Sequence, residues 1–284
     1  MTTNISNAFI SMFDEQVKKS FQARRQLGGL IREKTGVVGT TVRFQLIGKG
    51  IAQTRNALQD FTPLQTTYST VTATMQDFIA GDYTDLFHAP KINFSERQEL
   101  VDVTASAIGR RYDQLIMDSL SASSGTGAVA KTIQDDGSSG SAVGLNSGMI
   151  REAKRILDKN NVPPNERTLL IHANSLSQLL SNTSVTSADF NSVRALVSGS
   201  VDSWLGFKIV TVGDYDEGGL ALGSSERVVY AFHKSALGIG IGMNQTSKID
   251  YVPEKVSFMV ASMFSGGAIA IDPLGIVKIT HLDS

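Results

Sequence analysis

Two stretches in the N-terminal third of the chain alternate apolar and polar residues in the way that β-strands do. In "TTVRFQLIGKG", Val42 and Phe44 alternate with Arg43 and Gln45, and "TTYSTVTATMQDFIAGDY" is dense in β-branched residues. Such alternation predicts half-buried strands. The polar segment between them contains Pro63, which interrupts strand pairing. We therefore predict a long β-hairpin.

The length of this hairpin leaves two arrangements open. Twenty residues of extended strand would reach ~65 Å, whereas a compact chain of 284 residues has a radius of gyration near ~19 Å. The hairpin either folds back into an ordinary sheet or projects from the body as an arm. An isolated two-stranded hairpin is at best marginally stable in water, so a projecting arm has to rest on another subunit.

The stretch "NFSERQELVDVTASAIGRRYDQLIMDSL" has helical spacing. Ser95 and Gln98 fit a capping box. A helix over 95–120 would be ~39 Å long, so we predict a rigid strut. The residues that form its apolar stripe are Leu100, Val103, Ala107, Ile108, Leu115, Ile116 and Leu120. Residues 6–34 also carry apolar positions at helical spacing, which indicates an amphipathic helix or a string of turns ending near Gly28.

Residues 146–243 alternate helical and strand patterns, which is typical of an α/β sandwich. Helices are expected after Asn146, at "NSLSQLL" with Asn174 as its cap, and at "ADFNSVRALVSGS"; strands are expected at "RTLLIHA", "WLGFKIVTV" and "RVVYAFHKSALGIGIG". The tail "KVSFMVASMFSGGAIAIDPLGIVKITHL" reads as two or three further strands. Strands around residues 70–80 and 130 are their expected partners.

The run "ALGIGIGM" places Gly238, Gly240 and Gly242 at every second position. A dinucleotide fingerprint has the different spacing G-x-G-x-x-G between a strand and a helix. Here the glycines alternate with aliphatic residues, which predicts a strand with one bare face. A bare face usually marks the close approach of another backbone or a bend.

Composition and charge narrow the class of protein. The absence of cysteine excludes disulfides and cysteine-based zinc sites. Residues 1–60 hold nine basic and four acidic side chains, while the rest holds 17 basic and 23 acidic ones. This asymmetry favours contact between chains or a surface that faces nucleic acid, unless it is only a solvated helix face. The N-terminal stretch lacks the pattern of a signal peptide and no apolar run approaches ~20 residues, so we expect a soluble chain in the cytoplasm.

Catalytic motifs were sought without success. The four histidines, His88, His172, His233 and His281, are scattered singly. Asp214, Asp216 and Glu217 form an acidic cluster, but its alignment with a calcium loop fails at the last ligand, so a turn is favoured. Basic side chains on the hairpin, at Arg43, Lys49 and Arg55, have only Phe44 and Phe61 as nearby aromatics and make no stacking platform for nucleic acid.

The order of these elements resembles the tailed-bacteriophage major capsid proteins of the Johnson fold (the Hong Kong 97 type), and in pattern most of all those of short-tailed podophages. The stretches that carry the resemblance are "VRFQLIGKGIA", "ERQELVDVTASAIGRRYDQLIMDSL", "ERTLLIHANSLSQLL", "WLGFKIVTV", "VVYAFHKSALGIGIG" and "MVASMFSGGAIAIDPLGIVKI". It implies an α+β chain with an N-arm at 1–38, an extended β-hairpin E-loop at 39–86, a P-domain at 87–145 and 244–284 with a spine helix at 94–120, and an A-domain at 146–243.

The resemblance also implies a function. The chain would be a capsid subunit without enzymatic activity or cofactors, forming hexamers and pentamers of an icosahedral head that encloses double-stranded DNA. Its partners would be copies of itself, portal and scaffolding proteins, and packaged DNA through non-specific contact; it would be assembled in the host cytoplasm and belong to the virion. Residues 237–242 would lie at the crowded centre of the A-domain. The candidates for contacts between subunits are Arg43, Lys49, Arg55, Phe61, Gly238, Gly240 and Gly242.

Two alternatives stay open from the sequence. An encapsulin-type nanocompartment shell has the same fold and encloses cargo enzymes. A cytoplasmic α/β enzyme with an acidic metal site over Asp214–Glu217 belongs to a different class.

Overall fold

The computed structural model describes residues 25–58, 60, 63–86, 96–181, 203–213, 218–220 and 222–283. The helices are α1 (Glu96–Ala122), α2 (Ser147–Lys159) and α3 (Ala173–Ser181). The strands are β1 (Arg32–Thr35), β2 (Thr41–Ile47), β3 (Tyr68–Thr74), β4 (Gln76–Asp85), β5 (Gly127–Val129), β6 (Arg167–His172), β7 (Ser203–Trp204), β8 (Phe207–Val212), β9 (Leu222–Gly223), β10 (Glu226–His233), β11 (Leu237–Val252), β12 (Ser257–Ala270) and β13 (Ile276–Leu282).

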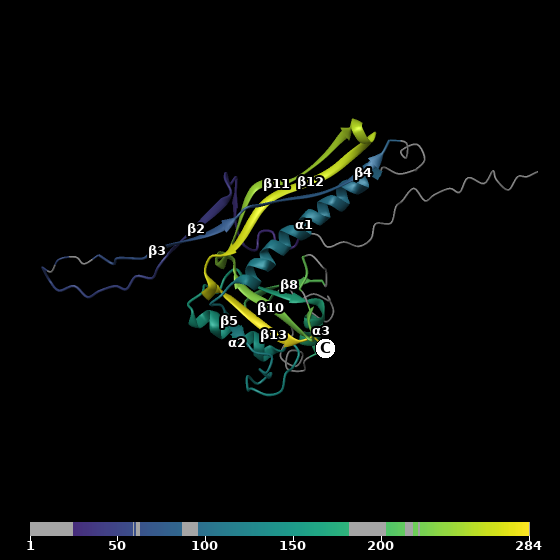
Figure 1. Ribbon diagram of the computed structural model, residues 1–284. Helices are drawn as coiled ribbons and strands as arrows, with labels where there is room; N and C mark the ends of the chain where they lie inside the picture. Colours follow the sequence, from purple (N-terminus) through teal and green to yellow (C-terminus); the bar gives the residue numbers. More distant parts are fainter. Residues whose placement is uncertain are drawn as a thin grey trace, which may run out of the picture.

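An elongated four-stranded sheet and the long helix α1 form one half of the body (Figure 1). The strand order is β1-β11-β12-β4, with β1 parallel to β11 and the other pairs antiparallel. One face of β12 packs on α1: Tyr112 meets Phe264 edge-on at 5.7 Å between ring centroids, and Thr104 Oγ1 lies 2.9 Å from Ser262 Oγ. The 27-residue α1 spans about 40 Å, as the apolar stripe predicted. Ser95, the predicted cap, lies outside the described residues.

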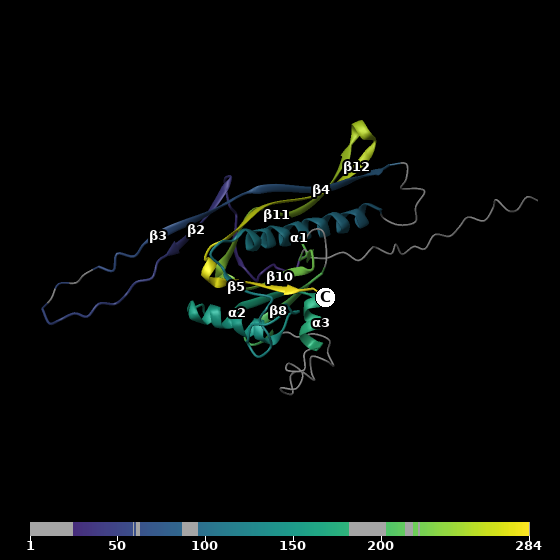
Figure 2. The ribbon, with the colours of Figure 1, turned by 60° about the horizontal axis from the view of Figure 1, so that its bottom comes forward.

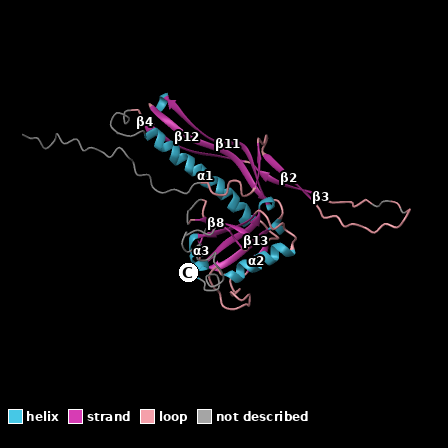
Figure 3. Cartoon of the chain, turned by 180° about the vertical axis from the view of Figure 1, so that it is seen from behind, coloured by secondary structure: helices cyan, strands magenta, loops and turns pink. Residues whose placement is uncertain are grey.

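A mixed sheet flanked by α2 and α3 forms the other half (Figure 3). Its order is β5-β13-β10-β6-β8-β7, with β9 beside β10. Every residue of β6 is buried, which agrees with the apolar run "RTLLIHA". Asn146 caps α2, because its side chain accepts from Met149 N at 2.9 Å. The helix predicted at "ADFNSVRALVSGS" lies outside the described residues.

Among the described strands, β2 and β3 pair with each other alone, and they form the root of an arm that leaves the body. Figures 1 and 2 show the arm and the β11–β12 hairpin pointing away from opposite ends of the four-stranded sheet. The projecting arrangement therefore holds for β2 and β3, whereas β4, the second half of the second predicted strand, returns to the four-stranded sheet of the body.

Three sequence-based expectations about the body need correction. The expected domain boundary between residues 243 and 244 falls inside β11, a continuous strand of 16 residues. β13, expected in the P-domain, pairs with β10 in the sheet of the α/β half. Asn174 does not cap α3: it lies within the helix, and its N–H donates to His172 Nδ1 at 3.2 Å.

The predicted strand partners of the tail are correct. β12 pairs with β4, the strand near residue 80, and β13 pairs in parallel with β5, the strand near residue 130. In the predicted N-terminal helix, the described part from residue 25 onward consists of turns followed by β1, so that part follows the alternative of a string of turns.

Candidate assembly surfaces

The arm carries apolar side chains that nothing in the described chain covers. Its two strands run antiparallel from the Thr41–Thr74 pair to the Ile47–Tyr68 pair. Leu58 is fully exposed and Ile51 is 81% exposed. The further apolar side chains exposed on the arm are Ile47, Leu64 and Tyr68. A monomeric protein seldom exposes apolar side chains that lie together, and such a surface marks a site of interaction.

The structure places three of the four predicted contact residues of the arm. Arg43, Lys49 and Arg55 are exposed on it. Phe61 lies outside the described residues. That these side chains contact another subunit stays a prediction.

The glycines of "ALGIGIGM" face the root of the arm within the same chain. A methyl group at Gly240 would lie 2.5 Å from Val42 Cγ1, and one at Gly238 would lie 2.7 Å from Phe44 Cζ. Both glycines are buried in β11. Gly238 and Gly240 thus face the arm of their own chain, and their part in contact between subunits stays a prediction. One expectation needs correction: their strand belongs to the sheet that carries α1 and not to the centre of the α/β half. Gly242 is exposed and stays a candidate for contact.

The arm root forms a hydrophobic cluster of its own, separate from the main core. Val42, Phe44, Ala73 and Ile271 are its buried members, each no more than 3% exposed. The alternation of "TTVRFQLIGKG" marked Val42 and Phe44 as buried. No signal in the sequence identified the glycines of β11 as the surface that covers them.

The face of the four-stranded sheet opposite α1 is only partly covered. The arm root packs on its glycine-rich end. Toward the other end, Ile79 and Tyr83 on β4 remain 69% and 44% exposed. They pair across the sheet with Met263 and Met259 of β12. This end of the face therefore offers a second apolar surface.

The tip of the β11–β12 hairpin continues this second surface. Tyr251 and Val256 are 47% and 41% exposed there, and Lys255 Nζ lies 3.8 Å from the centre of the Tyr83 ring. Val256 has a φ of 49°, a left-handed conformation that β-branched residues rarely adopt. Exposed apolar side chains thus occur at both ends of the elongated molecule, an arrangement suited to head-to-tail contact between copies.

A network of polar groups anchors the N-terminal segment on α1. The Asp113 carboxylate accepts from Gln26 N at 2.8 Å and Leu27 N at 3.1 Å. Burial raises the pKa of Asp113 to about 6, although these two N–H groups and the Arg25 charge act in the opposite direction. The attachment of residues 26 and 27 to α1 therefore depends on a buried carboxyl.

A second acid, Glu33, completes this anchor. It accepts from Tyr112 Oη at 2.8 Å, Gly29 N at 3.0 Å and Arg25 Nη2 at 2.9 Å. Burial acts to raise the pKa of Glu33, but these bonds and the Arg25 charge outweigh it and hold the pKa below its ordinary value. The guanidinium of Arg25 also lies 3.6 Å from the centre of the Tyr112 ring.

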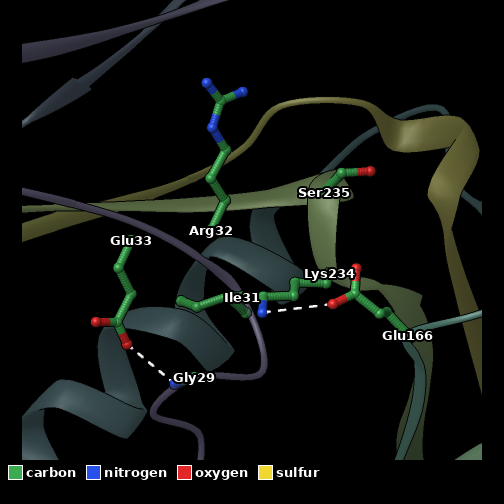
Figure 4. Close-up of a pocket in the computed structure, with 7 residues that line it drawn as sticks. All are labelled: Gly29, Ile31, Arg32, Glu33, Glu166, Lys234 and Ser235. Atoms are coloured by element: carbon green, nitrogen blue, oxygen red, sulfur yellow. Dashed lines mark hydrogen bonds and ion pairs between the residues drawn. The ribbon is translucent and has the colours of Figure 1, made fainter.

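A pocket of about 500 Å³ lies between the N-terminal segment and the start of β11 (Figure 4). Lys234 and Glu166 pair loosely across it at 3.6 Å, and Arg32 points away from this pair. Ser235 Oγ lies 2.7 Å from His233 Nδ1, but this is a local contact that caps a short 3₁₀ turn. The lining residues are Gly29, Ile31, Arg32, Glu33, Glu166, Lys234 and Ser235.

The described residues give no support to the enzyme hypothesis. Ser175 Oγ lies 2.9 Å from His281 Nε2, but both side chains are completely buried and out of reach of a substrate. No group of three His, Cys, Asp or Glu side chains in this part of the chain could hold a metal ion. The acidic cluster over 214–217 and His88 lie outside the described residues.

No helix among the described elements is long and apolar enough to cross a membrane.

Comparisons with known proteins match this chain to proteins of phage capsids. A family model described as phage capsid protein matches residues 5–283. The chain is similar to a capsid structure of cyanophage P-SCSP1u, with a TM-score of 0.78, 15% identity, and coverage of 100% of this chain and 96% of that one. It is similar to the acid-stable capsid structure of Helicobacter pylori bacteriophage KHP30, with a TM-score of 0.79, 10% identity, and coverage of 99% and 98%.

A third similar structure comes from Mycobacterium phage Che8, with a TM-score of 0.70, 19% identity, and coverage of 96% of this chain and 97% of that one. No curated protein matches the chain.

Proposed function

Because this chain belongs to the phage capsid protein family and is a major capsid protein that forms a phage head shell, we propose that the arm of each copy lies on the body of a neighbouring copy. Its fold is the Johnson-type α+β fold expected from the sequence. Repetition of the arm contact closes hexamers and pentamers into an icosahedral shell around double-stranded DNA. Assembly takes place in the host cytoplasm.

The exposed apolar surface of the arm is the observation that carries this proposal. Ile51 and Leu58 are 81% and 101% exposed, and nothing in the described part of the chain covers them. Covering one such side chain contributes about 1.5–3 kcal/mol. The five exposed apolar side chains in the described part of each arm thus supply a substantial driving force for association. Obligate interfaces of this kind bury thousands of Å².

The distribution of charged residues supports contact between the arm of one copy and the opposite end of the four-stranded sheet in the next copy. Along the arm, Arg43, Lys49 and Arg55 outnumber the single acid Asp60. Around the far end, at the tip of the β11–β12 hairpin and the end of β4, the acids are Asp82, Asp85, Asp250 and Glu254, against the bases Arg97, Lys248 and Lys255. Opposite net charges steer encounter and fix the register of an interface. A basic arm against an acidic sheet end therefore favours a head-to-tail arrangement.

The domain roles follow the architecture. We assign the N-arm to residues 1–38 and the E-loop to the segment from 39 to the end of β3. The P-domain comprises α1 with β4, β11 and β12, and the A-domain comprises the mixed sheet with α2 and α3, including β13. Portal and scaffolding proteins are the expected further partners, and packaged DNA meets the shell through non-specific contact.

Replacement of residues 48–67 by a short turn tests the arm contact. β4 must be retained because it is an edge strand of the four-stranded sheet, so a longer deletion would disrupt the body. We expect folded, helix-containing subunits that sediment as small species and form no shells in negative-stain micrographs. Closed particles from this variant would contradict the proposal.

The content of the intact particles separates a phage head from an encapsulin. Shells purified from a host that carries the complete phage should contain double-stranded DNA of uniform length. Particles that hold a cargo enzyme and no DNA would favour a nanocompartment.

A further inference from the structure

We propose that Gly238 and Gly240 of β11 are positioning residues that hold the arm at one angle to the body, and that this angle sets the curvature of the shell. The inference rests on the proposed function, in which the arm contacts a neighbouring copy. It explains why the chain places glycines on one face of this strand.

The absence of side chains at Gly238 and Gly240 leaves two gaps on the face of β11, here called the glycine slots, which Phe44 and Val42 of β2 fill. A methyl group at Gly240 would lie 2.5 Å from Val42 Cγ1, and one at Gly238 would lie 2.7 Å from Phe44 Cζ and 2.8 Å from Ile271 Cδ1. Carbon atoms in contact are normally about 3.5–4.0 Å apart. Any larger residue in either slot would therefore push β2 away from β11 by roughly 1 Å.

The second strand of the arm is held equally close. A methyl group at Gly267 of β12 would lie 2.2 Å from the carbonyl oxygen of Thr74, at the end of β3. That neighbour is backbone, so it cannot turn aside as a flexible side chain would. β2 on β11 and β3 on β12 are thus seated at two separate places on the same face of the sheet.

Backbone hydrogen bonds order the base of the arm. Val37 N donates to Ile241 O of β11 at 3.1 Å where the chain enters the arm, and Met75 N donates to Thr40 O at 2.9 Å, which joins the two strands of the arm to each other where they leave the body. The buried cluster of Val42, Phe44, Ala73 and Ile271 packs the base of the arm on the body. The root therefore cannot rock without breaking buried contacts.

The distal arm lacks such constraints. Between Ile47 and Tyr68, the described residues contain no paired strands, and Gly48 N donates to Thr67 O at 2.8 Å close to the root. Adjustment to different neighbours therefore takes place in 48–67, while the root transmits a constant angle. A small tilt at the root becomes a larger displacement at the distal end, so the glycine slots determine where the next subunit lies.

The test compares the shells formed by Gly240→Ala with those of the unchanged chain. We expect Gly240→Ala to fold and to give particles whose mean diameter in electron micrographs differs from that of the unchanged shells, or open sheets. The double variant Gly240→Ala/Val42→Ala removes both methyl groups of Val42 and leaves its Cβ 2.9 Å from the new methyl group, so it should bring the diameter back toward the original one. Unchanged diameters for the single variant, or no rescue by the double variant, would overturn the proposal.

Gly127→Ala is the matched control, because its new methyl group would lie 2.7 Å from Ile156 Cγ2, in the α/β half and away from the arm. It should lower the stability of the subunit and leave the diameter unchanged. An equal change of diameter in this control would show that loss of stability alone alters the shell, and the proposal would fail.

Phe44→Leu keeps the test decisive if Gly240→Ala does not fold. It loosens the root instead of crowding it, so the distribution of diameters should broaden; an unchanged distribution would contradict the proposal.

The replacement of residues 48–67 distinguishes the proposed arm contact from the proposed positioning role of the glycines. If that variant still assembles, the proposed arm contact is wrong. If it blocks assembly while Gly240→Ala leaves the diameter unchanged, only the positioning role is wrong.

Discussion

Arg227 donates to Asp283 through both Nε and Nη2, at 2.9 and 2.6 Å, and the two side chains are only 1% and 3% exposed. The pair joins β10 to the residue that follows β13, so it fastens the end of the chain to the centre of the mixed sheet. A buried charge that loses its partner is strongly destabilising.

Asp283→Ala should therefore lower the free energy of unfolding by about 3–5 kcal/mol, measured by urea denaturation. Glu152→Ala is the control, because its partner Arg155 is 61% exposed and surface pairs contribute about 0–1 kcal/mol. Similar losses from the two variants would contradict the role assigned to the buried pair.

The Asp113 anchor predicts a dependence of stability on pH. The pKa of this carboxyl rises from 3.8 to about 6 in the folded chain, so the folded state binds the proton more tightly than the unfolded state. Its contribution to stability is therefore fully present below about pH 4 and is lost as the pH rises through about 6. The stability of the unchanged chain relative to Asp113→Asn should fall by roughly 3 kcal/mol between pH 4 and 7.

Urea denaturation of both proteins across this range measures the difference. Subtracting the Asp113→Asn curve removes the contribution of the other titrating groups, including Glu33, whose pKa moves in the opposite direction. A difference that stays constant with pH, or that grows as the pH rises, would contradict the assignment to Asp113.

The apolar side chains of the arm should matter for assembly and not for folding. The double variant Ile51→Ser/Leu58→Ser changes side chains that are 81% and 101% exposed, so the subunit should keep its thermal unfolding midpoint. Because each buried side chain contributes about 1.5–3 kcal/mol to a contact, the concentration needed for assembly should rise at least tenfold in light-scattering assays. Leu222→Ser, on the body and 48% exposed, should leave that concentration unchanged if the arm alone drives association.

The two asparagines near helix starts should respond differently to alanine. Asn146→Ala removes the cap of α2, in which Asn146 Oδ1 accepts from Met149 N at 2.9 Å, and should cost about 1 kcal/mol. Asn174 is exposed inside α3, so Asn174→Ala should be neutral or stabilising by about 0.5 kcal/mol. Thermal unfolding of both variants decides whether the caps are correctly assigned.

Local patterns in the sequence predicted most of the elements. The alternation of Val42 and Phe44, the apolar stripe of the helix from Leu100 to Leu120, and the short apolar run Leu169–Ile171 in β6 are all local patterns, which can be read from a segment of sequence alone. Ends of elements were less reliable: Asn174 has the chemistry of a cap, but His172, two residues earlier, takes that role.

The placement of the candidate contact residues could be predicted in part. Exposure of Arg43 and Lys49 fits the alternation of "TTVRFQLIGKG", and exposed Arg55 lies in the polar segment that follows it. The roles of Gly238 and Gly240 did not follow, because a bare strand face is compatible with any close neighbour, within the chain or from another copy. The second apolar surface, around Ile79 and Tyr83, was missed because "QDFIAGDYTD" reads as an ordinary strand until it is known which face α1 covers.

The sequence by itself therefore determined the kinds of elements, their order and the presence of a hairpin too long for the body. Only the tertiary structure decided that the hairpin projects, that β11 runs across the expected domain boundary, and that its glycines receive Val42 and Phe44. The reason is physical: periodicity records which side of a segment is buried, while the partner that buries it comes from residues about 200 positions away, brought together by packing that no local pattern encodes.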